Sequence, residues 1–488
     1  MFAPLLCVAA FAPVLPSQET NEKDPTDAAF DHFRDRYELY STIGDLDRDE
    51  FRSLISLSVA DSDFNDDDAP HLIGLEALER LDLSGAKITD RALESIGRLP
   101  IGLRALDVSD TSITDEGLVW LAFLESLEAL DVSGTSVTDT AVVQMPRFKG
   151  SLMSLTLGSG VSDEGLLAVP ELTSLEHLSV SVDGISSEGA AAIAGSASLR
   201  RLELRGEKVS LGILREIAAM DGLESLALSG FSGLKDRHLE PLERMPSLRF
   251  LDVSGTGISD EGLVVIAAIP QISGLVLSDT AVTDAGMKHL GDMVWHEEGA
   301  EVSLRTATEL THIELARTAI TDRGLDHLNA LPIARLDVSE TQITNAAKKT
   351  LDRWKLESIA LRGTSKLTDL SFVVGQPELL TLDVSQKQGI NSQVRHLDEH
   401  PSLRVLDLSY TDLQDAATMP LTRLRRLREL NVAGTAVSLE NLAILAELGK
   451  LELVNVRDTN ILVHGEERRE LLPGVKVSRS ESFPDFAR

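Results

Sequence analysis

Apolar and polar positions alternate along this chain in a pattern that repeats many times. The phrases "LDVSDTSITDEGL" (106–118), "LDVSGTSVTDTAV" (130–142) and "LDVSGTGISDEGL" (251–263) are three copies of it. When the middle leucine of L-x-x-L-x-L is aligned, about seventeen units follow one another in steps of 23 to 25 residues, apart from one step of 38. The ladder reads Leu57, Leu81, Leu106, Leu130, Leu155, Leu178, Leu202, Leu226, Leu251, Leu275, Ile313, Leu336, Ile359, Leu382, Leu406, Leu430 and Val454. This period predicts a repeat architecture and makes a domain count from chain length invalid.

Each unit opens with a segment typical of a short strand. In "LRALDVS" (103–109), alternation with a period of two sends Leu106 and Val108 inward and leaves Ala105, Asp107 and Ser109 facing outward.

A turn with a recurrent threonine follows the strand. Its hydroxyl can hydrogen-bond to loop backbone, so that buried turn amides and carbonyls are not left unpaired. The threonines are Thr111, Thr135, Thr256, Thr280, Thr318, Thr341, Thr411, Thr435 and Thr459.

A short helix closes the unit, as in "ITDEGLVWLAFL" (113–124). Thr114 is placed as an N-cap, and Asp115 and Glu116 lie at the positive end of the helix dipole. Leucines at 118, 121 and 124 share one face. A small residue recurs in the first helical turn although glycine is costly in helices, which indicates close approach of the adjacent unit. The positions are Gly117, Gly165, Gly189, Gly262, Gly286 and Gly324, with Ala92 and Ala141 elsewhere.

No single unit can bury its apolar side, so the units must stack into one long core. The predicted fold class is α/β: a curved solenoid with a parallel sheet on the concave face and short helices on the convex face. The chain resembles leucine-rich repeat proteins, and its "T-x-I-T-D-x-G-L" turn resembles the subtype found in F-box-associated and bacterial repeat proteins, over residues 51–477. No F-box pattern precedes the repeats, and the resemblance indicates fold far more strongly than function.

The predicted organisation has four parts. Residues 1–18 are apolar and have the pattern of a secretory signal peptide, although no Lys or Arg precedes the apolar run. Residues 19–50 form an N-terminal helical cap, with Phe30, Phe33 and Tyr37 at helical spacing. The solenoid covers 51–470, and 471–488 holds a capping strand and a tail. The expected location is secreted, periplasmic or at the cell surface, with the cytoplasm as the alternative.

Composition narrows the class of partner. The formal net charge is −32, which disfavours nucleic acid and anionic membranes and suits either plain solubility or a basic partner. Apolar residues make up 43% and aromatic residues only 4%, so the core must be aliphatic. The lone cysteine, Cys7, excludes an intrachain disulfide framework.

Two motifs resemble metal-binding sequences, but both fit the repeat pattern better than a metal site. "HLDEH" (396–400) matches the H-x-x-E-H zinc pattern, but Leu397 takes a core position and His400 ends the helix, which favours a solvated helix end. "DSDFNDDD" (61–68) lacks the glycine and the glutamate of a calcium loop and is interpreted as an acidic surface turn. We therefore expect no catalytic residues, no metal and no cofactor.

A protein partner is expected on the concave face. The outward strand position is repeatedly acidic, which predicts either a basic ligand or a repeat consensus in which each Asp bonds to nearby Ser or Arg. The candidate binding residues are Asp82, Asp107, Asp131, Asp252, Phe250, His312, Asp337, Asp383 and Asp407. An insertion at 294–309 carries Trp295 as a second candidate anchor. The favoured function is a non-catalytic interaction scaffold. A structural or adhesion array and an F-box-like adaptor remain alternatives, and the oligomeric state is left open.

Overall fold

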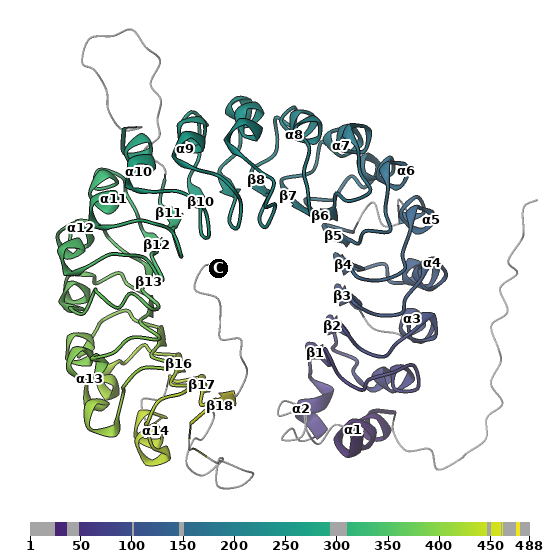
Figure 1. Ribbon diagram of the computed structural model, residues 1–488. Helices are drawn as coiled ribbons and strands as arrows, with labels where there is room; N and C mark the ends of the chain where they lie inside the picture. The colour runs from purple at the N-terminus through teal and green to yellow at the C-terminus, as the bar shows by residue number, and fades with distance from the viewer. Residues whose placement is uncertain are drawn as a thin grey trace, which may run out of the picture.

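The chain folds into a curved solenoid whose strands line the inner side and whose helices lie outside (Figure 1). The computed structural model describes residues 25–36, 48–99, 102–145, 151–292, 310–446, 450–459, 461 and 475–478. The predicted signal peptide, Tyr37, the 294–309 insertion with Trp295, and the tail after 478 lie outside these residues.

One parallel sheet of eighteen strands runs through the described part of the chain. The predicted ladder is confirmed residue by residue, because Leu57 pairs with Leu81, Leu81 with Leu106, and so on to Val454. The strands are β1 Ser56–Ser58, β2 Arg80–Asp82, β3 Ala105–Asp107, β4 Ala129–Asp131, β5 Ser154–Leu157, β6 His177–Ser181, β7 Arg201–Arg205, β8 Ser225–Ala227, β9 Phe250–Asp252, β10 Gly274–Val276, β11 His312–Glu314, β12 Arg335–Asp337, β13 Ser358–Ala360, β14 Thr381–Asp383, β15 Val405–Asp407, β16 Glu429–Asn431, β17 Leu453–Asn455 and β18 Lys476–Ser478.

Short helices cover the outer side of the sheet. Many units close with a turn of 3₁₀ helix, as at 119–123 and 419–423. The α-helices are α1 Pro25–Arg36, α2 Arg48–Arg52, α3 Asp90–Gly97, α4 Asp115–Leu118, α5 Asp139–Val142, α6 Asp163–Leu166, α7 Ser187–Ala194, α8 Leu211–Ile217, α9 Asp260–Ile266, α10 Asp284–Gly291, α11 Asp322–His327, α12 Lys348–Leu351, α13 Ile390–Gln393 and α14 Leu439–Ala446.

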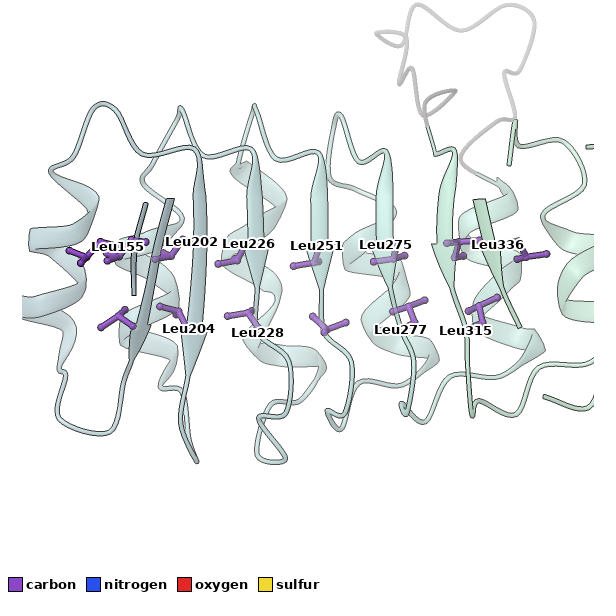
Figure 2. Packing of buried hydrophobic residues seen from close by; sticks show 14 of the residues in the cluster. Leu155, Leu202, Leu204, Leu226, Leu228, Leu251, Leu275, Leu277, Leu315 and Leu336 are labelled. Carbon is purple, nitrogen blue, oxygen red and sulfur yellow. The ribbon is translucent and has the colours of Figure 1, made fainter. Parts of the chain in front are cut away.

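The core is a continuous aliphatic column between sheet and helices. Figure 2 shows two rows of inward side chains, with Leu226 and Leu228 from one strand beside Leu251 and Leu275 from the next two. All four are fully buried. Burying a leucine contributes about 1.5–3 kcal/mol, and each unit obtains this burial only from its neighbours.

The N-terminal end of the core is closed by aromatic residues. Phe30 and Phe33 of α1 pack against Phe51 of α2, with ring centroids 5.5 and 5.9 Å from that of Phe51. Phe33 also stacks on Phe64 of the first repeat. α1 and α2 therefore cover apolar surface that the first repeat would otherwise expose.

The turn threonines act as predicted. Thr111 is buried and its hydroxyl donates to the carbonyl of Val108 at 2.6 Å, within its own unit. The other eight predicted threonines make the same bond.

A second hydrogen-bond ladder joins the starts of many neighbouring helices. Asp90 Oδ1 and Oδ2 accept from the backbone N–H and the hydroxyl of Thr114, the next N-cap, both at 2.8 Å. The same two bonds recur at Asp66–Thr89, Asp115–Thr138, Asp139–Ser162, Asp163–Ser186, Asp236–Ser259, Asp260–Thr283, Asp284–Thr321 and Asp322–Thr344. This ladder explains the first-turn glycines, because a Cβ on Gly117 would overlap the Asp90 carboxylate.

The long step in the ladder does not interrupt the stack. β10 pairs directly with β11 through Leu275 and Ile313, and Asp284 bonds to Thr321 across the same gap. Within the described residues, no helix is long and apolar enough to cross a membrane.

Candidate functional site

The concave face carries the predicted acidic column, and each aspartate of it serves first in its own turn. Asp107 Oδ1 accepts from the backbone N–H of Ser109 at 2.9 Å and from its hydroxyl at 2.6 Å. The backbone bond recurs from the serine two residues after Asp82, Asp131, Asp252, Asp337, Asp383 and Asp407. The repeat-consensus interpretation therefore accounts for at least one carboxylate oxygen of each Asp. The second oxygen of Asp82 also accepts from the Ser58 hydroxyl at 2.7 Å.

The first part of the column is open. Asp82, Asp107 and Asp131 are in register on β2, β3 and β4, and all three are partly exposed. They line a hollow of about 400 Å³ whose other walls are mostly Ser, Ala and Thr. Burial raises the pKa of Asp107 above its usual value, the Ser109 bonds oppose the shift, and the charges of Asp131 and Asp82 raise it further. Among the described residues, no Lys, Arg or His forms an ion pair with these three carboxylates.

The last part of the column is closed. Asp383 and Asp407 are neighbours on β14 and β15 and are only 8% and 6% exposed. Burial, and then the charge of Asp407, raises the pKa of Asp383 to about 7. Asn431 donates to Asp407 Oδ2 at 2.7 Å. The pair is therefore not fully ionised at neutral pH and has little surface to offer a ligand.

The middle of the column contains the two predicted ring residues in contact. The ring centroids of Phe250 and His312 lie 5.8 Å apart, and the Phe250 ring extends over Gly274, where a Cβ would overlap it. His312 Nε2 lies 2.9 Å from Glu314 Oε1. Burial is the largest of the effects that raise the pKa of the nearby Asp252. Phe250 thus lies along the sheet and forms part of a flat surface.

Asp337 is partly exposed. Burial raises its pKa, hydrogen bonds from Ser339 oppose the shift, and Arg317 lowers it slightly. Arg317 pairs with Asp279 at the turn beyond the strand, where it adopts a positive φ of 55°.

The two motifs that suggested metal chemistry are ordinary parts of the repeats. Leu397 is fully buried, but His400 is also buried, with Nε2 3.0 Å from the carbonyl oxygen of Gln376, which corrects the expectation of a solvated helix end. The prediction that the acidic turn lies at the surface is wrong for Asp68, which is fully buried, with its Oδ1 2.8 Å from His32 Nε2. In the described residues, no group of three or more His, Cys, Asp or Glu could hold a metal ion.

Sequence reasoning missed one residue, Lys387, and the contact that Tyr410 makes. Lys387 replaces the turn threonine of its unit, and that departure was the available signal. Its buried Nζ donates to the hydroxyl of Thr364 at 2.7 Å, and desolvation lowers the pKa of Lys387 to about 8. Tyr410 has a φ of 53°, is 45% exposed, and donates its hydroxyl to Asp458 at 2.6 Å, two units away.

Comparison with known proteins gives one family match and several similar solved structures. The family model described as Leucine Rich repeat matches residues 77–97, 103–122, 244–267 and 399–421. No curated protein matches the chain. Similar solved structures include an internalin from Listeria monocytogenes, with 18% identity, TM-score 0.41, and coverage of 76% of this chain and all of that one. The structure of a TLR13–ssRNA13 complex has 17% identity, TM-score 0.46, and coverage of 83% and 64%. The mouse RP105/MD-1 complex has 17% identity, TM-score 0.41, and coverage of 84% and 76%.

The family matches fall on units of the ladder, and the ladder's seventeen positions pair in unbroken register along one parallel sheet. The chain has the fold of a leucine-rich repeat solenoid.

Proposed function

We propose that this protein is a non-catalytic interaction scaffold that binds a protein partner on its concave face. The observation that carries the proposal is the continuous inner sheet, to which every unit contributes outward side chains at a fixed spacing of about 4.8 Å. Leucine-rich repeat architecture suits an interaction module because side chains can vary in these columns without disturbing the buried ladder.

The proposed partner is basic. The open carboxylates of Asp82, Asp107 and Asp131 form no ion pair among the described residues, although Arg80 lines the same hollow, and the net charge of −32 attracts positively charged surfaces. We also propose the division into a signal peptide at 1–18, a cap at 19–50, a solenoid at 51–470 and a closing segment at 471–488. In this scheme the protein acts outside the cytoplasm.

Affinity capture from the native host after mild cross-linking tests the proposal. The wild type is compared with Asp107→Asn/Asp131→Asn/Asp252→Asn, in which each amide oxygen can still accept from the turn serine. Leu167→Gln, at a convex residue that is 66% exposed, is the control. A protein captured by the wild type and the control but lost by the triple variant supports the concave site.

Other outcomes contradict the proposal. Capture that is lost only with Leu167→Gln would place the partner on the convex face. Equal capture by all three would refute a role for the acidic column. If no protein is captured and deletion of one whole repeat is tolerated in the host, the chain acts as a structural array.

A further inference from the structure

The strands around the concave hollow at the N-terminal end have a regular spacing that favours one kind of partner structure. We propose that the sheet face of β2–β6 binds an α-helix of the partner, laid across the strands, with basic side chains at positions i, i+3 and i+7. This inference rests on the proposed scaffold function and names the partner's form and charge pattern.

The first observation is a row of carboxylates that form no ion pair among the described residues. Asp82, Asp107 and Asp131 stand one strand apart in exact Cα register. The column before them is Arg80, Ala105, Ala129 and Ser154, so three of its four side chains are small. This leaves the hollow of about 400 Å³ beside the carboxylates, into which long basic side chains fit.

The second observation is an unsatisfied polar atom in the same column. After Asp131 the column continues through Thr156 to Ser179 of β6. Ser179 is only 2% exposed, and its Oγ has no hydrogen-bond partner within the described chain. A buried hydroxyl without a partner is uncommon and costs stability, so this position of the row lacks a polar group that a ligand can supply.

Spacing decides between a helix and an extended segment. Neighbouring strands of a sheet lie about 4.8 Å apart, so the row presents a contact every 4.8 Å. In an extended chain, side chains on one face recur about every 6.6 Å and fall out of step after one strand. In a helix, positions i, i+3, i+7, i+10 and i+14 share a face, and their average step of 3.5 residues rises about 5.2 Å. A helix therefore stays in step from Asp82 to Ser179.

The other half of the concave face does not offer this match. The carboxyls of Asp383 and Asp407 are buried, and Asn431 occupies one of their oxygens. The column is also interrupted there by Ala360 between Asp337 and Asp383. The helix-binding row is confined to the N-terminal part of the solenoid.

Two designed peptides test the inference with the full chain. The first is a helix-forming peptide with Lys at i, i+3 and i+7 and Gln at i+14. The second has the same composition with its lysines distributed around the helix. Circular dichroism first establishes equal helicity, and fluorescence anisotropy then gives the affinities. Each exposed ion pair is worth up to about fivefold, so we expect the first peptide to bind about tenfold more tightly.

Matched variants locate the site. Asp82→Asn/Asp107→Asn/Asp131→Asn should reduce the preference for the first peptide to less than twofold. The control Glu171→Gln/Glu188→Gln/Asp221→Asn removes the same charge at exposed positions outside the sheet and should keep the preference. If the triple variant does not fold, Asp107→Asn alone should reduce the affinity for the first peptide by about threefold.

Equal affinity for the two peptides, or a preference that survives in the triple variant, would overturn the helix inference. These results would leave the scaffold function standing, because that function is judged by capture of the native partner. If the Asp107→Asn/Asp131→Asn/Asp252→Asn variant loses native capture while the wild type binds the two peptides equally, the partner binds the concave face and is not a helix.

Discussion

The hydrogen-bond ladder between helix starts makes a strong stability prediction at Asp163. Its carboxylate accepts from the backbone N–H of Ser186 at 2.8 Å, from the Ser186 hydroxyl at 2.6 Å, and from the N–H of Gly189 at 3.0 Å. At a partly exposed site, each such bond contributes about 0.5–1.5 kcal/mol. We therefore expect Asp163→Ala to lower the free energy of unfolding by about 2–3 kcal/mol.

The conservative variant and the control sharpen this expectation. Asp163→Asn keeps one acceptor oxygen, so it should lose about half as much. Asp221→Ala changes an exposed residue outside the ladder and should stay within about 0.5 kcal/mol of the wild type. Urea unfolding gives the free energies, and hydrogen exchange shows whether the loss is confined to the units that contain α6 and α7, since repeat arrays can unfold locally.

The pH dependence gives a second check on the same residue. Burial alone would raise the pKa of Asp163, but the bonds from Ser186 and Gly189 outweigh burial and lower it. A carboxyl with a lowered folded pKa stabilises the protein above its unfolded pKa of about 3.9 and loses that effect as pH falls further. The gap between wild type and Asp163→Ala should thus narrow below about pH 4. A constant gap, or an Asp163→Ala variant as stable as Asp221→Ala, would refute a role for the ladder.

Three further predictions follow from other parts of the molecule. Gly434→Ala should destabilise by more than about 1 kcal/mol in urea unfolding, because Gly434 has a φ of 64° and a Cβ would overlap the Tyr410 ring; an unchanged midpoint would contradict this. Asp383→Asn should match the wild type near pH 4 and be more stable by about 2–4 kcal/mol above pH 8. The reason is that a carboxyl whose folded pKa is raised to about 7 costs stability as pH rises from its unfolded pKa of about 3.9 to about 7, because the unfolded state ionises over this range and the folded state does not; parallel pH profiles would refute it. N-terminal sequencing of protein from the host should show that residues 1–18 are removed, and an intact Met1 would favour the cytoplasm.

Most of the fold could be predicted because one physical requirement recurs in every unit. Leu106 and its equivalents must reach a shared core, so their spacing reports the strand positions directly. The threonine at 111 has a role inside its own unit, which local sequence can reveal. The glycine at 117 signalled close packing, but the partner that requires it, Asp90, lies in the preceding unit. Contacts between units were therefore predictable in kind and not in detail.

The burial of polar residues was harder to predict from the sequence. Nothing in "HLDEH" shows that His400 is covered by the unit before it and lies against Gln376. Likewise, Asp107 and Asp383 occupy the same place in the same phrase, and only the neighbouring columns decide that one is open and the other enclosed. The difference depends on side chains some 24 residues away in sequence and one strand away in space.

The acidity of the chain has a structural origin that bears on function. A typical unit uses one aspartate to close the strand turn, as Asp107 does, and another to cap the next helix, as Asp90 does. Both roles use carboxylate oxygens within the array, so a high count of acidic residues does not by itself indicate a ligand. A binding site is expected where the aspartates of a unit are not used only to close a turn or to cap a helix. The open row at Asp82 to Asp131 is such a place, since its carboxylates line a hollow without an ion pair among the described residues and its column continues to the buried Ser179, whose hydroxyl has no hydrogen-bond partner within the described chain.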